Sequence, residues 1–109
     1  MSVHSSRLGA VASSTTTYTT IYTTPAAVRT ILKSLVCTNL GSAATVVHVL
    51  LSAGGTLYAH WTINVAAYKA SGGCVIFSPW TVLNAGDTIQ VASDAANVNV
   101  VASGTELDL

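Results

Sequence analysis

Turn-forming residues interrupt this chain about every 10 to 12 residues, and the segments between them are too short for ordinary helices. These segments are rich in Val, Ile, Thr and aromatic residues, which favour extended strands. The clearest turns lie at residues 39–42, 53–55, 84–87 and 94–96. About seven or eight short strands with antiparallel connections predict an all-β fold, a single antiparallel β-sandwich that is jelly-roll-like. A small open barrel is the alternative.

The clearest hairpin pairs residues 45–52 with residues 56–63. A three-residue loop centred on Gly54 gathers the apolar side chains of both strands on one face, whereas a two-residue Gly54-Gly55 turn mixes the faces. We therefore expect the three-residue loop. With this register, the predicted core consists of Ile31, Leu35, Val47, Val49, Leu51, Leu57, Trp61, Ile63, Ile89 and Val91.

Residues 29–39 alternate in a way that leaves apolar side chains on both faces of the predicted strand. The apolar side chains divide between the two faces as Ile31, Leu35 and Cys37 against Leu32 and Val36. Such a strand is covered on one side by a second sheet and is approached on the other side by something else.

The start of the chain differs in pattern from the rest. Residues 1–14 show no periodicity, which predicts a flexible N-terminal arm, and residues 15–109 then form the β-sandwich domain. Residues 15–24 contain seven threonines interleaved with Tyr and Ile, which predicts a solvated edge strand that Pro25 ends.

Charge is sparse in this sequence. Four Lys or Arg residues balance four Asp or Glu residues, and charged residues make up 7% of the 109 residues. A typical soluble domain has about 25%. Fifteen Thr and twelve Ser residues supply hydroxyls in their place. A surface with so little charge repulsion favours association, so the composition favours a subunit of an assembly.

Several partners are not expected on the same grounds. Four scattered cations cannot neutralise a nucleic-acid backbone, so we expect no nucleic acid as a partner. The longest nearly apolar run, residues 46–51, is far shorter than the roughly 20 residues that cross a membrane. The N-terminus also lacks the apolar stretch of a signal peptide. We therefore expect no membrane partner and no secretion.

The sequence shows no pattern of a catalytic or metal site. It contains neither a nucleophile elbow nor a phosphate-binding loop, so we expect no enzymatic activity and no cofactor. Cys37 and Cys74 lack metal-site spacing and are expected to be reduced, buried thiols. Solvated roles in turns and at the terminus are expected for the four carboxylates, Asp87, Asp94, Glu106 and Asp108.

Two histidines lie on the face of the predicted hairpin that points away from the core. The expected register puts His48 directly opposite His60, but no third metal ligand is evident, so contact with a partner is favoured. All four basic residues precede residue 70 and all acidic residues follow residue 86, so a neighbour's acidic tail could pair with the basic part. Pairing within the chain explains this distribution equally well. The candidate partner interface comprises Val46, His48, Leu50, Tyr58, His60 and Arg7.

Several segments of the chain resemble small virion-associated proteins of tailed bacteriophages. The resemblance covers roughly residues 17–107, and its most specific piece is the Gly-Asp-x-Ile step at residues 86–89. It is carried by YTTP at 22–25, VRTILKSLVCTN at 28–39, GSAATVV at 41–47, VLNAGDTIQV at 82–91 and residues 98–106.

The resemblance implies a compact, non-enzymatic β-sandwich that is added to a virion in many copies, often as a homotrimer. Because the chain is a single small domain with a non-periodic arm that could lie over neighbouring subunits, we expect a capsid decoration or cement protein. Such a protein is made in the cytoplasm of the bacterial host, binds the assembled shell and stabilises it. The implied partners are the major capsid protein or other virion structural proteins. A tail, neck or fibre-associated protein is the first alternative, and a module that binds host-surface carbohydrate is the second.

Overall fold

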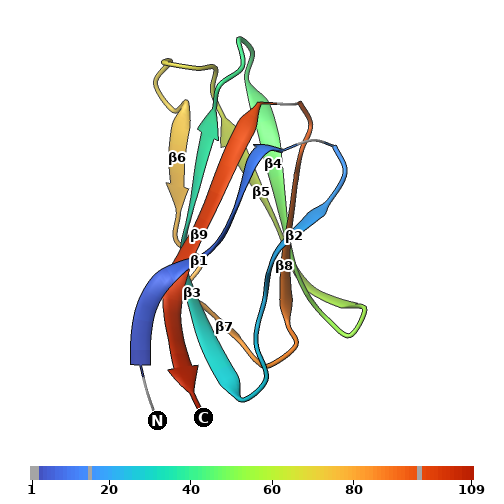
Figure 1. Cartoon of the computed structure of the whole chain (residues 1–109). Helices are drawn as coiled ribbons and strands as arrows, with labels where there is room; N and C mark the ends of the chain where they lie inside the picture. Colours follow the sequence, from blue (N-terminus) through green and yellow to red (C-terminus); the bar gives the residue numbers. More distant parts are fainter. Residues whose placement is uncertain (1–2, 15, 96) are drawn as a thin grey trace.

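The computed structural model is a sandwich of two antiparallel sheets (Figure 1). It describes residues 3–14, 16–95 and 97–109, without the side chains at positions 6 and 12–14, so positions 1–2 of the expected arm and Ala96 of a predicted turn lie outside the described residues. These residues form no helix, and hence none that is long and apolar enough to span a membrane. The strands are β1 (Val3–Ser14), β2 (Thr19–Thr23), β3 (Val28–Asn39), β4 (Thr45–Ala53), β5 (Thr56–Val65), β6 (Cys74–Phe77), β7 (Thr81–Leu83), β8 (Thr88–Ser93) and β9 (Val98–Asp108).

The path of the chain confirms the predicted β-sandwich and its jelly-roll character. One sheet has the strand order β1-β9-β3-β6, with β7 also paired to β3, and the other has the order β2-β8-β4-β5. In both sheets, strands from the start of the chain alternate with strands from its end, which is the winding of a jelly roll. β6 and β7 are two pieces of one edge, interrupted near Pro79.

The segment expected to be a flexible arm is a strand of the sandwich instead. β1 pairs antiparallel with β9, beginning with Val3 opposite Leu107. Two register shifts interrupt this pairing, one after Arg7 and one after Val11. The prediction is wrong for residues 3–14 because such irregularities erase the two-residue period by which a strand is recognised in a sequence.

The core lies between the two sheets and is close to the predicted one. Seven of the ten predicted core side chains are buried: Leu35, Val47, Val49, Leu51, Ile63, Ile89 and Val91. Fully buried side chains that the prediction left out include Leu32, Leu83, Val98 and Val100. Trp61 packs against the border of this core and is only partly buried, with its ring centroid 5.7 Å from that of Phe77.

A register shift exchanges the two faces of β3 part-way along the strand. The shift falls between Leu32 and Ser34 in the pairing with β9, so Lys33 is an extra residue. Leu32 therefore faces the core before the shift and Leu35 faces it after the shift, although they are three residues apart. Ile31, which strict alternation places in the core, lies on the outer face and is partly exposed.

The turn of the β4–β5 hairpin has two residues rather than the predicted three. Ala53 lies opposite Thr56, and the turn consists of Gly54 and Gly55, which adopt φ values of 56° and 85°. Glycine is suited to both positions because a side chain would strain a backbone at positive φ.

A bulge at Tyr58 then restores the apolar pairing that a two-residue turn alone would break. Beyond this extra residue the register places Leu51 opposite Ala59, so the inward faces of the two strands match again. The prediction that Leu57 belongs to the core is wrong, because Leu57 precedes the bulge and is exposed. Neither of the two turns considered from the sequence included a bulge.

Both cysteines are free thiols, but only one of them is buried as predicted. Cys37 faces the core, and its burial raises the pKa of the thiol to about 11. Cys74 is exposed because it lies on the edge strand β6, opposite Thr38 on the outer face. The Thr38 hydroxyl donates a hydrogen bond to Cys74 Sγ at 3.4 Å.

Leu35→Ala is expected to lower the free energy of unfolding by about 2–5 kcal/mol, because removing a fully buried leucine leaves a cavity. Leu57→Ala makes the same change at an exposed position and should alter this free energy by less than about 0.5 kcal/mol. Urea denaturation of both variants measures the two values. A loss above about 2 kcal/mol for Leu57→Ala would contradict the bulged register and restore the predicted one.

Candidate interaction surface

The sandwich has one side on which two edge strands leave the space between the sheets accessible. β5 is the edge of one sheet, and β6 with β7 forms an edge of the other. We define this surface, made by β5, β6 and β7, as the open side. The outer backbone groups of an edge strand have no partner within their sheet, so such a strand can pair with another chain.

Large apolar side chains gather along the open side. Among them are Tyr58 (69%) and Trp80 (64%), with Ile76 (68%) and Val82 (51%) on the outer face of β6 and β7. On the neighbouring outer face of β3, Ile31 and Val36 lie opposite Val82 and Ile76 and add partly exposed apolar surface. Exposed apolar groups concentrated on one surface are typical of sites that bind other proteins.

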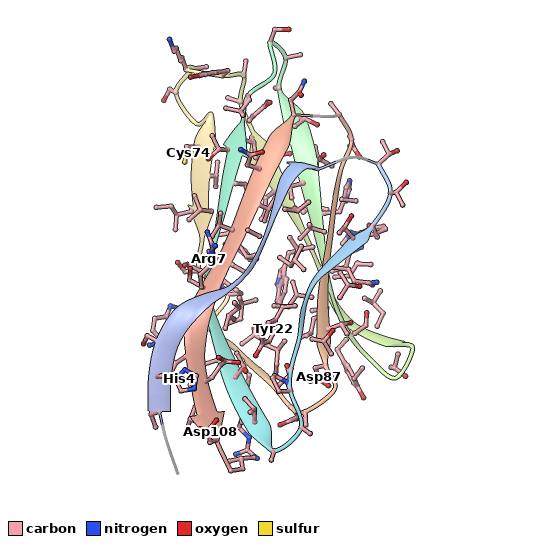
Figure 2. The ribbon with its side chains drawn as sticks, in the orientation of Figure 1. His4, Arg7, Tyr22, Cys74, Asp87 and Asp108 are labelled. Atoms are coloured by element: carbon pink, nitrogen blue, oxygen red, sulfur yellow. The ribbon has the colours of Figure 1, made fainter. Side chains whose placement is uncertain are left out.

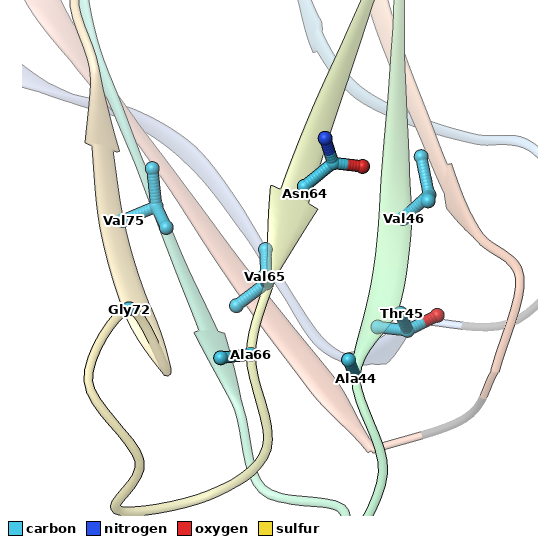
Figure 3. A pocket seen from close by; sticks show the side chains of 8 residues that line it. All are labelled: Ala44, Thr45, Val46, Asn64, Val65, Ala66, Gly72 and Val75. Atoms are coloured by element: carbon cyan, nitrogen blue, oxygen red, sulfur yellow. The ribbon is translucent and has the colours of Figure 1, made fainter.

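Two pockets lie along the open side. The larger has a volume of about 460 Å³ and lies where the ends of β4 and β5 approach β6, with Val65 and Val75 among its lining residues (Figure 3). The hydroxyl of Thr45, which also lines it, is buried without a hydrogen-bond partner. The smaller pocket, of about 270 Å³, lies between the hairpin and β7 and is lined by both Tyr58 and Val82. A docked segment would find apolar contacts in both pockets.

Trp80, which lies between β6 and β7 on the open side, is held in an unusual backbone conformation. It joins β6 to β7 directly after Pro79 and has a φ of 48°, which costs free energy for a bulky residue. The Lys33 ammonium lies 5.4 Å from the centroid of its ring, within range of a cation–π interaction. The bulge in β3 and the break between β6 and β7 thus together present an exposed indole.

The structure divides the six residues of the predicted partner interface among three surfaces. Four of them share the outer face of β4 and β5, as predicted: Val46, His48, Leu50 and His60. The bulge moves Tyr58 to the open side. Arg7 lies on β1, opposite Ser103, in the other sheet (Figure 2). The predicted set is therefore not one continuous interface within a single chain.

The predicted contact between the two histidines is present, although they are not directly opposite each other. His48 pairs with Thr62 and His60 pairs with Leu50, so the two rings are diagonal neighbours. His48 Nδ1 and His60 Nε2 are 3.3 Å apart. On the other side of its ring, His48 Nε2 lies 2.9 Å from Asp94 Oδ1, so Asp94 is not the purely solvated residue expected. We define His48, His60 and Asp94 as the histidine cluster.

Glu106, expected to be a solvated tail residue, belongs to a polar network at the border of the core. The Tyr22 hydroxyl donates a hydrogen bond to Glu106 Oε2 at 2.7 Å and lies 2.7 Å from Thr30 Oγ1. His4 lies 3.7 Å from Glu106 Oε1 and 3.9 Å from Asp108 Oδ1 (Figure 2). This network links β1, β2, β3 and β9, so its role is structural.

Asp87, the last of the four carboxylates, lies in the turn between β7 and β8. Asp87 has the turn role expected for it, since its Oδ2 accepts a hydrogen bond from the backbone N–H of Asn84 at 2.9 Å. Within the described part of the chain, no group of three or more His, Cys, Asp or Glu side chains is placed to hold a metal ion.

No family model and no curated protein matches this chain. Its fold is similar to that in a structure of Bacillus endospore appendages, a novel family of disulfide-linked pili, with a TM-score of 0.58 and 13% identity over 98% of this chain and 88% of that chain. It is also similar to part of a chain in the structure of infectious bursal disease virus, Gx strain, with a TM-score of 0.53 and 11% identity. That match covers 96% of this chain and only 31% of the viral one. At these identities the likeness shows a shared fold.

The alkaline stability of the protein should depend on Tyr22. Burial, together with the Glu106 carboxylate, raises the pKa of Tyr22 from 10.0 to about 12. Because the unfolded chain releases this proton first, the stabilisation is present below about pH 10 and is lost as the pH rises to about 12. Tyr22→Phe should therefore lose less stability over this range than the wild type, as measured by urea denaturation.

Tyr58→Phe is the matched control, since the Tyr58 ring is exposed. The free energy of unfolding of this variant should change with pH as it does in the wild type. The comparison between variants also cancels the contribution of the Cys37 thiol, which titrates in the same range. Identical alkaline profiles for wild type and Tyr22→Phe would show that the network does not hold the phenol in its neutral form.

Proposed function

We propose that the protein is a non-enzymatic structural subunit of a multi-copy assembly, the virion of a tailed bacteriophage. Within the virion we assign it to the capsid surface, as a decoration or cement protein that binds the assembled shell. A protein that binds only the assembled state stabilises it by mass action. The proposed partners are the major capsid protein and further copies of this chain, as a homotrimer.

The observation that carries this proposal is the open side. Four large apolar side chains are exposed there beside an unpaired edge strand, in a protein with a formal net charge of zero. Such a surface is costly to leave in water and offers little electrostatic repulsion between neighbours. It suits lasting contact with other subunits, where Trp and Tyr side chains often contribute most of the binding energy.

The structural similarities support the same class of function. One similar structure is that of pili and another is that of a virus, so the fold occurs in proteins that build large assemblies. Double-sheet jelly rolls also recur in viral capsid proteins. The sequence resemblance to virion-associated phage proteins supports the more specific assignment to a tailed phage.

The open side is favoured over the outer face of β4 and β5 as the main attachment surface. On that outer face, Val46 and Leu50 are only partly exposed, and the histidine cluster adds polar groups around them. A subunit that touches more than one neighbour would use the outer face of β4 and β5 for a second contact. The same holds for Arg7 on the other sheet.

Trp80 also gives weight to a second candidate, a module that binds host-surface carbohydrate. Jelly rolls include lectin domains, and an exposed indole offers an apolar face to a ligand. A sugar-binding module would retain its ligand as an isolated protein, whereas a decoration protein needs the assembled shell. Binding of the purified protein to a glycan array therefore separates the two candidates.

Quantitative gel densitometry of purified particles tests the main proposal. We expect the copy number of a capsid decoration protein to match capsid symmetry, and a low copy number would favour the tail, neck or fibre alternative. Trp80→Ala should lower incorporation at least about tenfold, as expected for an aromatic side chain central to an interface. The matched control is Tyr18→Ala, which removes an exposed aromatic ring outside the open side.

Equal incorporation of Trp80→Ala, Tyr18→Ala and wild type would show that the open side does not attach the protein. Absence of the wild-type protein from purified particles would overturn the virion assignment altogether. Circular dichroism of the purified variants confirms that a loss of incorporation does not reflect unfolding.

A further inference from the structure

The histidine cluster has a geometry that contact with a protein partner does not require. His48 comes from β4, His60 from β5 and Asp94 from the turn after β8, so the two strands of one hairpin and a turn distant in the sequence converge on one face. The two imidazoles are tilted by 53° with their ring centroids 5.5 Å apart, so they do not stack face to face. Instead, one nitrogen of each ring approaches the other.

The distance between these nitrogens fits two ligands of a single metal ion. In a tetrahedral zinc site each imidazole nitrogen lies about 2.0–2.1 Å from the ion, which places two such nitrogens about 3.3–3.4 Å apart. His48 Nδ1 and His60 Nε2 are 3.3 Å apart. Without an ion, the same separation allows a long hydrogen bond between the two nitrogens, so the rings already lie in the arrangement that the ion needs.

Asp94 contacts the nitrogen of the His48 ring that faces away from His60. Its carboxylate lies 2.9 Å from His48 Nε2, and because an ionised carboxylate only accepts hydrogen bonds, Nε2 must carry the proton. The neutral His48 ring then has its lone pair on Nδ1, the nitrogen that faces His60. Histidine ligands of metals commonly donate their second N–H to a carboxylate in this way, which fixes the ring and raises its basicity.

We propose that His48 Nδ1 and His60 Nε2 bind one divalent transition-metal ion of the zinc, nickel or copper class, with Asp94 orienting His48. Imidazole suits these ions, whereas magnesium and calcium prefer oxygen ligands. Two protein ligands leave further coordination positions to water, so the ion is exchangeable. The site needs no partner chain and does not depend on the proposed virion role.

The proposal departs from the expectation that the sequence contains no metal site. That expectation rested on the lack of a third ligand, and the structure supplies an orienting carboxylate instead. Paired strands hold the two rings in place, because β4 and β5 are hydrogen-bonded along their length. Little rearrangement is therefore needed for the ion to bind.

Isothermal titration of the untagged protein with zinc chloride tests the site. We expect one saturable ion per chain in the wild type and no saturable binding in His48→Ala or His60→Ala. Asp94→Ala should bind about tenfold more weakly, at the lower end of the range for orienting residues, because Asp94 is itself exposed. Asp94→Asn keeps a hydrogen-bond acceptor and should lose less than Asp94→Ala.

His4→Ala is the matched control, because it removes the third histidine, which lies on β1 in the other sheet. Its zinc binding should equal that of the wild type. Nuclear magnetic resonance of imidazole nitrogens gives a second readout, in which zinc should shift His48 Nδ1 and His60 Nε2. Since His60 is exposed, His60→Ala should stay folded, and circular dichroism checks this.

Three results would overturn the proposal. The first is the absence of saturable binding of zinc, nickel and copper by the wild-type protein. The second is wild-type affinity in both His48→Ala and His60→Ala, which would place any bound ion elsewhere. The third is a zinc-induced shift of His48 Nε2 instead of Nδ1, which would mean that Asp94 does not orient the ring.

Discussion

The antiparallel pairing of β3 with β9 is the constraint on which the rest of this sandwich depends. It extends from Val28 opposite Asp108 to Asn39 opposite Val98, and all other strands of this sheet attach to one of the two. β1 pairs with β9, while β6 and β7 share the other edge of β3. One register shift within this pair decides which side chains of β3 reach the core, and it also leaves Lys33 beside the exposed Trp80.

The sequence predicts the strands and turns of this fold far better than the irregularities between them. Alternation and turn residues are local properties, so the sandwich and seven of ten core side chains follow from them. Bulges are different, because one extra residue in a strand changes faces only in relation to its partner. The misplacements of Ile31 and Leu57, and the missed strand β1, all trace to such shifts.

The candidate surfaces were predictable to a similar degree. The proximity of His48 and His60 follows from the hairpin even with an inexact register, since diagonal neighbours also touch. The contribution of Asp94 was not predictable, because it depends on how β8 lies beside β4. One sequence feature indicated the open side, namely the apolar side chains on both faces of residues 29–39 in the adjoining strand β3. The exposed apolar side chains on β6 and β7 become apparent only once those short strands are placed.

The pairing of β1 with β9 also bears on whether the order of the strands along the chain could be changed without changing the fold. Val3 pairs with Leu107. The start of β1 and the end of β9 lie at the same end of the sandwich (Figure 1). The exposed Gly54-Gly55 turn joins β4 to β5 at another point of the surface. A circularly permuted chain could therefore begin at β5 and end at β4, with a short linker between the present first and last strands. The two strands of the β4–β5 hairpin would then pair as the first and last strands of the sandwich, as β1 and β9 do in the present strand order.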